Sequence, residues 1–186
     1  MRMNFGVKPW MYPMPVLIIG TYNEDGTVNA MNAAWGGIVG ADKIAICVDA
    51  GHKTTANFKA RNAFTVSFAD AAHVAEADYV GITSGNDVPD KVERAGLHAV
   101  KSDIVDAPVI EEFPMSLECE VVSYDDETEI LIGQILNVSA DECVLDESGN
   151  IDPAKFGPIT FDPVNNTYIK LGETVGAAFS DGAKIK

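Results

Sequence analysis

The chain has 186 residues, 47% of them hydrophobic, and its 28 acidic against 13 basic side chains give a formal net charge of -15. This length and apolar content predict a single domain over residues 1–186, without a linker long enough to separate two. Such acidity argues against nucleic-acid binding, which needs a broad basic face, and against docking on anionic membranes. No stretch approaches the roughly 20 apolar residues of a membrane helix. We therefore expect a soluble, cytoplasmic protein.

The cysteines and histidines argue against disulfides and metal sites. Cys47, Cys119 and Cys143 are odd in number and far apart, which favours a reducing compartment. Cys47 and Cys119 lie in apolar runs, where a free thiol is expected to be a small buried hydrophobe. The three histidines are also dispersed, so we expect no metal site.

The first third of the chain predicts strands and one helix. Residues 16–22 are rich in β-formers and end at an Asp-Gly turn within 23–27, which predicts a hairpin with a returning strand from residue 28. Residues 43–49 and 63–68 are typical of strands. The segment 54–62 between them predicts a helix, with Thr54 or Thr55 as N-cap and Phe58 facing inward.

The rest of the chain predicts helices and loops over 71–97, then long strands over 115–124 and 128–141. Their expected inward side chains are Leu117, Cys119, Val121, Ile130, Ile132 and Ile135. The strands pair mostly as antiparallel neighbours, with helices inserted and no regular βαβ alternation. This predicts an α+β, mainly β fold built on a closed or split β-barrel. No dinucleotide fingerprint or P-loop is present.

The segment DAGHKTTANFKARN, residues 49–62, is locally basic in an acidic chain. A helix that begins near Thr54 presents unpaired N–H groups and a partial positive charge, and Lys53 adds a full charge. This combination suits a phosphate. The alternative is a capped surface helix with ordinary basic residues, and Lys59 and Arg61 fit that description because they fall a turn or more away.

The segment NAMNAAWGG, residues 29–37, has little side-chain bulk, so its backbone can approach a flat ligand closely. Asn29 and Asn32 supply amide groups, and Trp35 supplies an aromatic wall. The alternative is close strand packing in a tight barrel with Trp35 in the core.

Together the two segments suggest a ligand with a planar head and a phosphate tail, which describes flavin mononucleotide (FMN). No nucleophile–base pair stands out. Any redox chemistry would therefore belong to the cofactor.

At this point the chain resembles a known family. The stretches PVLIIGTYNEDGTVNAMNAAWGG, HKTTANF, EADYVGITSGNDVPDK, AGLHAVKSDIVDAPVIEEFPMSLEC and YIKLGE are similar to the flavin reductase-like proteins, within them to the flavoredoxin branch. The resemblance covers nearly the whole chain in the same order. It implies a split β-barrel that forms a homodimer and binds FMN non-covalently near the subunit interface.

The resemblance also implies three groups of cofactor-binding residues. The isoalloxazine ring is lined by Asn32, Ala33, Ala34 and Trp35. The phosphate is held by His52, Lys53 and Thr54, while Val48 and Asp49 lie beside the flavin. The phosphate or ribityl chain is also reached by Ser84 and Lys91.

Three departures from the family pattern bear on function. Asn32 stands where threonine is frequent, and Lys53 beside His52 replaces a frequent arginine with a point charge. The Gly-Asp-His motif of NADH-dependent flavin reductases is missing. The leading interpretation is thus an FMN electron carrier served by a redox partner protein. The alternatives are an NAD(P)H-dependent flavin reductase and a non-catalytic flavin-binding module.

Overall fold

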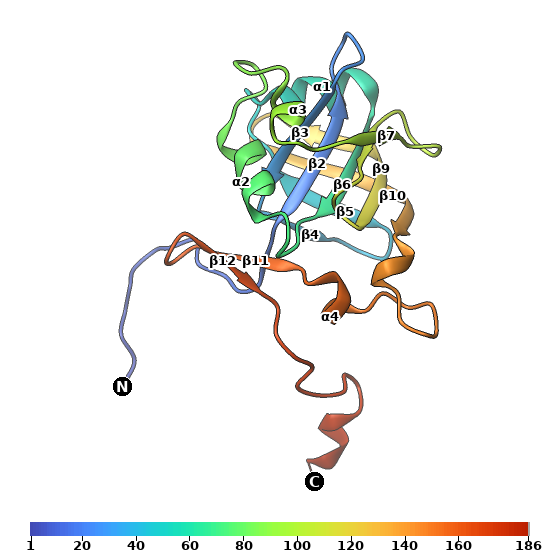
Figure 1. The fold of residues 1–186 in the computed structure, drawn as a ribbon. Coiled ribbons are helices and arrows are strands. Elements are labelled where there is room, and N and C mark those ends of the chain that lie inside the picture. Colours follow the sequence, from blue (N-terminus) through green and yellow to red (C-terminus); the bar gives the residue numbers. More distant parts are fainter. Residues whose placement is uncertain (186) are drawn as a thin grey trace.

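A computed structural model describes residues 1–185, and its centre is a seven-stranded antiparallel sheet that curls into a half-barrel (Figure 1). The strand order is β3-β2-β6-β9-β10-β5-β4. The strands are β2 (Leu17–Tyr22), β3 (Val28–Ala33), β4 (Gly36–Ile38), β5 (Lys43–Cys47), β6 (Ala63–Phe68), β9 (Met115–Asp125) and β10 (Ile130–Ala140). The predicted mainly β barrel architecture is confirmed.

Short helices cover the sheet. Helix α1 (Lys53–Arg61) packs against β2, and both α2 (Val74–Ile82) and α3 (Lys91–Arg94) pack against β3. The remaining helices are α4 (Pro153–Phe156) and two 3-10 turns, Glu142–Val144 and Asp181–Lys184. Within residues 1–185, no helix is long and apolar enough to span a membrane.

Two smaller sheets flank the half-barrel. One joins β1 (Met14–Pro15), β11 (Ile159–Asp162) and β12 (Thr167–Lys170), and the other pairs β7 (Ala99–Lys101) with β8 (Pro108–Ile110). The two ends of the chain run away from the barrel, both towards the bottom of Figure 1.

The predicted hairpin is confirmed. Strands β2 and β3 pair from Leu17 opposite Ala33 to Tyr22 opposite Val28. Gly26 takes a φ of 86° in the connecting turn, a conformation that glycine adopts without steric cost. The returning arm then breaks at residues 34–35 and resumes as β4, so that Trp35 lies where the chain changes direction.

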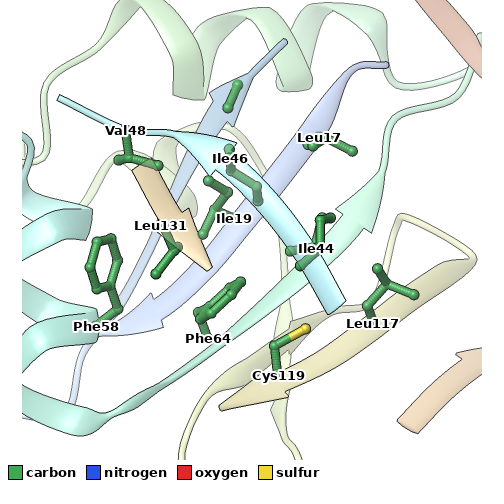
Figure 2. Packing of buried hydrophobic residues seen from close by; sticks show 12 residues of the cluster. Leu17, Ile19, Ile44, Ile46, Val48, Phe58, Phe64, Leu117, Cys119 and Leu131 are labelled. Atoms are coloured by element: carbon green, nitrogen blue, oxygen red, sulfur yellow. The ribbon is translucent and has the colours of Figure 1, made fainter. Parts of the chain in front are cut away.

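The main core fills the inside of the half-barrel (Figure 2). Phe58 from α1 is fully buried, as predicted, and its ring centroid lies 6.3 Å from that of Phe64 on β6. Leu17 and Ile19 from β2 and Leu131 from β10 complete the packing around them. This contact fixes α1 against the sheet.

Two expectations about buried positions were wrong. On β10 the inward positions are Leu131 and Gly133, whereas Ile130 and Ile132 are only partly buried and lie outside the core clusters. A Cβ at position 133 would come 2.3 Å from the Phe64 ring, so the sheet needs a glycine on that face. Cys119 is buried as expected, but Cys47 is exposed because its side chain faces away from the barrel interior.

Candidate functional site

A hydrogen-bonded turn connects β5 to α1. The Asp49 carboxylate accepts a hydrogen bond from the N–H of Gly51 at 2.7 Å. The Asp49 carbonyl accepts from the N–H of His52 at 3.1 Å and from the Thr55 hydroxyl at 2.7 Å. These bonds begin the helix at Lys53 with His52 as N-cap, so the prediction of Thr54 or Thr55 as N-cap was wrong.

The first two N–H groups of α1 remain open. Among the hydrogen bonds of residues 1–185, none uses the N–H of Lys53 or Thr54, whereas those of Thr55 and Ala56 are donated to the His52 carbonyl. No acidic side chain lies in the first turn. The helix start therefore presents two adjacent backbone donors and a partial positive charge.

A polar groove of about 190 Å³ lies at this helix start. Its walls come from β3, from the start of α1 and from the segment after α2. Lining residues include Asn29, His52, Lys53, Thr54, Ser84 and Lys91. All five residues predicted to reach the phosphate or ribityl chain therefore meet in one groove.

An apolar groove of about 250 Å³ adjoins the polar groove. Met31, Asn32, His52, Gly81 and Ile82 line both. The apolar groove is otherwise lined by Ala33, Ala34, Trp35, Cys47, Asp78, Phe161 and Tyr168. The four residues predicted to line a ring thus lie together.

Trp35 belongs to the surface of the apolar groove and not to the core. Its side chain is 53% exposed, which rules out the alternative that it serves as a core residue. Beside it, Asn32 donates its amide N–H to the Ala77 carbonyl at 3.1 Å and so ties β3 to α2. Aromatic, amide and small side chains therefore border a single shallow cavity.

Two glycines allow the segment 81–85 to close over β3. A Cβ at Gly81 would come 2.8 Å from that of Asn32, and a Cβ at Gly85 would come 2.4 Å from Asn29 Oδ1. Side chains at either position would push the segment away and widen the grooves. The close approach depends on their absence.

Lys91 is a buried cation at the floor of the polar groove. It is 3% exposed, and its Nζ donates to the carbonyls of Val80 at 2.8 Å and Thr83 at 2.7 Å, at the end of α2. Burial lowers its pKa from 10.5 to about 8. An ammonium has three donors, so one N–H is left for a ligand while the other two hold the helix end.

Val48 and Asp49 line neither groove. Val48 is buried in the core, and its carbonyl accepts a hydrogen bond from the Tyr124 hydroxyl at 2.7 Å. Asp49 builds the turn before α1. Both residues hold the helix start in place, and their position beside the flavin stays a prediction.

Lys59 and Arg61 point elsewhere. Lys59 pairs with Asp126, and Arg61 pairs with Asp106 at 3.0 Å and donates to the Asn23 carbonyl at 2.7 Å. Neither lines the grooves. Their description as ordinary helix cations is consistent with these contacts.

The comparisons with known proteins identify the family. The model of the flavin reductase like domain matches residues 11–161 of the chain. The chain belongs to the flavin reductase-like family. Its structure is similar to that of the flavoredoxin of Desulfovibrio vulgaris (Miyazaki F), with 38% identity, a TM-score of 0.94 and coverage of 98% of this chain and 100% of that one.

Two further solved structures are similar to this chain. A flavoredoxin from Methanosarcina acetivorans is 27% identical with a TM-score of 0.88, over 98% of this chain and 97% of that one. A protein with a split barrel domain from Shewanella frigidimarina shares the fold at 16% identity and a TM-score of 0.77, over 90% and 86% of the two chains. Within the flavin reductase-like family, the chain falls in the flavoredoxin branch.

Several groove residues were not predicted. Asp78 and Tyr168 line the apolar groove, and the Tyr168 hydroxyl donates to the Asp78 carboxylate at 2.8 Å. Burial, followed by this hydrogen bond, raises the pKa of Tyr168 to about 12. The two residues are 90 positions apart, and only the YIKLGE stretch shared with flavin reductase-like proteins hinted at Tyr168.

Proposed function

We propose that this flavin reductase-like protein binds FMN non-covalently across the two grooves and passes electrons through it, in the manner of a flavoredoxin. The observation that carries the proposal is the junction of the grooves. A flat, small-residue surface at Trp35 continues, through Asn32 and His52, into a helix start with open N–H groups. This arrangement suits one ligand that is planar and apolar at one end and anionic at the other.

The donor set of the polar groove fits a phosphate. Phosphate oxygens only accept hydrogen bonds, and the groove offers the N–H groups of Lys53 and Thr54, the Thr54 hydroxyl and the ammonium groups of Lys53 and Lys91. Helix starts with this composition bind anions. Ser84 is exposed on the opposite wall and supplies a further hydroxyl.

The apolar groove fits an isoalloxazine ring. Ala33 and Ala34 leave the β3 backbone accessible, and Trp35 stands at the edge as a stacking surface. Bound there, the flavin would supply the electron-transfer chemistry. The protein side chains would position the ring, limit its contact with water and set the local field.

We further propose that the protein acts as a homodimer in the cytoplasm. Trp35, Ile38 and Ile82 are 53%, 61% and 76% exposed, and two of them line the apolar groove. A second copy over this surface would bury them. The cysteines are free, which suits a reducing compartment. Light scattering on the flavin-loaded protein tests the dimer.

Spectroscopy tests the function. The purified protein, or apoprotein given FMN, should show the visible absorption of bound flavin, and a colourless protein that takes up no FMN would refute the proposal. Anaerobic addition of NADH, NADPH or a strong chemical reductant then separates the candidates. Bleaching by the chemical reductant but not by pyridine nucleotides supports a carrier fed by a basic partner protein. Fast bleaching by NADH or NADPH supports the flavin reductase. A flavin that no donor reduces supports a binding module without turnover.

A further inference from the structure

Beneath the polar groove runs a chain of buried polar side chains. Thr54 and Asn29 line the groove, and below them lie Thr21, Asn57 and Asn23. All five are less than 9% exposed, and Thr21 is fully buried. Burial of uncharged polar groups is costly unless every one is hydrogen-bonded, so a connected set at this place calls for an explanation.

Two side-chain amides, those of Asn29 and Asn57, donate all four hydrogen bonds of this chain. Asn29 Nδ2 donates to Thr54 Oγ1 at 2.8 Å and to Thr21 Oγ1 at 3.3 Å. Asn57 Nδ2 donates to Thr21 Oγ1 at 3.1 Å and to Asn23 Oδ1 at 2.9 Å. Amide nitrogens can only donate. Thr21 therefore receives two donors and holds both amides in this orientation.

The bond from Asn29 determines what the Thr54 hydroxyl can offer a ligand. A hydroxyl has one proton and two lone pairs. Because Thr54 Oγ1 accepts from Asn29 below, its own proton remains available to an acceptor in the groove. Asn29 is also confined from the other side, since Gly85 leaves no room for even a Cβ beside Asn29 Oδ1.

We propose that Thr21 and Asn57 are positioning residues for a phosphate ester: they orient the Asn29 amide so that Thr54 presents its hydroxyl proton to the phosphate. The inference rests on the proposed binding of FMN and extends it to side chains that do not touch the groove. A purely structural role, tying α1 to the β2–β3 hairpin, would affect all ligands of the two grooves alike.

The experiment compares FMN with riboflavin, which has the same ring and no phosphate, on apoprotein by fluorescence titration. Thr21→Val keeps the shape and removes the double acceptor. We expect FMN affinity to fall about 5- to 10-fold, as for one neutral hydrogen bond, and riboflavin affinity to stay unchanged. Thr65→Val is the matched control, because Thr65 is an equally buried threonine that donates to the Pro108 carbonyl and lines neither groove. It should alter neither affinity.

Three results would overturn the inference: an unchanged FMN affinity in Thr21→Val, an equal loss for both ligands, or an equal effect of Thr65→Val. If Thr21→Val does not fold, Asn57→Ala removes the donor at the lower end of the chain and is read by the same comparison. Failure of the unmodified protein to bind either flavin is a different result. It would refute the proposed function itself before any variant is compared.

Discussion

The ionisation of Lys91 predicts a pH dependence of FMN binding that riboflavin lacks. Burial holds the pKa of this ammonium at about 8 in the free protein. A bound phosphate beside it favours the charged form and raises that pKa. Above pH 8 Lys91 is mostly deprotonated in the free protein and must take up a proton when FMN binds. FMN affinity should therefore fall as pH rises.

The magnitude follows from the free-protein pKa of about 8. If Lys91 stays charged in the complex, the apparent affinity falls by the factor by which the free protonated fraction falls, about 25-fold between pH 7.5 and 9.5. The phosphate itself does not titrate in this range, because its second pKa is near 6. Riboflavin affinity should be flat.

Two variants make the test specific. Lys91→Arg keeps a positive charge throughout the range, so FMN binding should lose its pH dependence. Lys91→Gln removes the charge, so binding should be weaker and equally flat. Fluorescence titrations of apoprotein at five pH values suffice. An equal fall for riboflavin, or a fall retained in both variants, would refute the assignment of Lys91 to the phosphate.

Four further substitutions test the site and the core. Lys53→Ala or Thr54→Ala should weaken FMN binding by about 1–3 kcal/mol in equilibrium titrations, whereas Lys59→Ala, which removes a cation paired with Asp126, should not; equal effects would argue against the phosphate site. Trp35→Ala should shift the absorption spectrum of bound flavin while it changes the free energy of unfolding by less than about 1 kcal/mol, since half of this side chain is exposed; a stability change alone would return Trp35 to a structural role. Phe58→Ala should cost about 3–5 kcal/mol of stability in chemical denaturation, and a cost below about 1 kcal/mol would contradict its place in the core.

Local signals predicted the parts of the fold that local sequence determines. The Asp-Gly turn specified the β2–β3 hairpin because a short turn fixes the register of its strands. The helix after β5 was also predicted, but its first residue was not. Thr54 and Thr55 have the chemistry of N-caps, yet one hydroxyl accepts from Asn29 and the other donates to the Asp49 carbonyl. Both hydroxyls are therefore engaged elsewhere, one by a distant strand and one within the turn itself, and His52 takes the cap position.

The pattern of apolar residues could not predict which side chains of β10 face the core. Ile130, Leu131 and Ile132 are consecutive and apolar, so alternation does not say which one faces inward. The inward face is set by Gly133, which leaves room for the Phe64 ring from a strand nearly 70 residues earlier. A glycine carries no hydrophobic signal. The Asp78–Tyr168 pair could not be predicted from local sequence either, because its members meet only when β12 folds beside α2.

The basic segment in an acidic chain divides into two parts with different electrostatic roles. The later cations, Lys59 and Arg61, are paired with Asp126 and Asp106 on neighbouring segments, so they contribute little net field at the helix start. Among the ion pairs of residues 1–185, none includes Lys53, and its side chain lines the polar groove. Lys91 lines the same groove, so two cations that form no ion pair among the described residues lie near the open N–H groups. The acidic surface elsewhere repels anions, so anion binding is confined to this groove. The same acidic surface is suited to a basic redox partner.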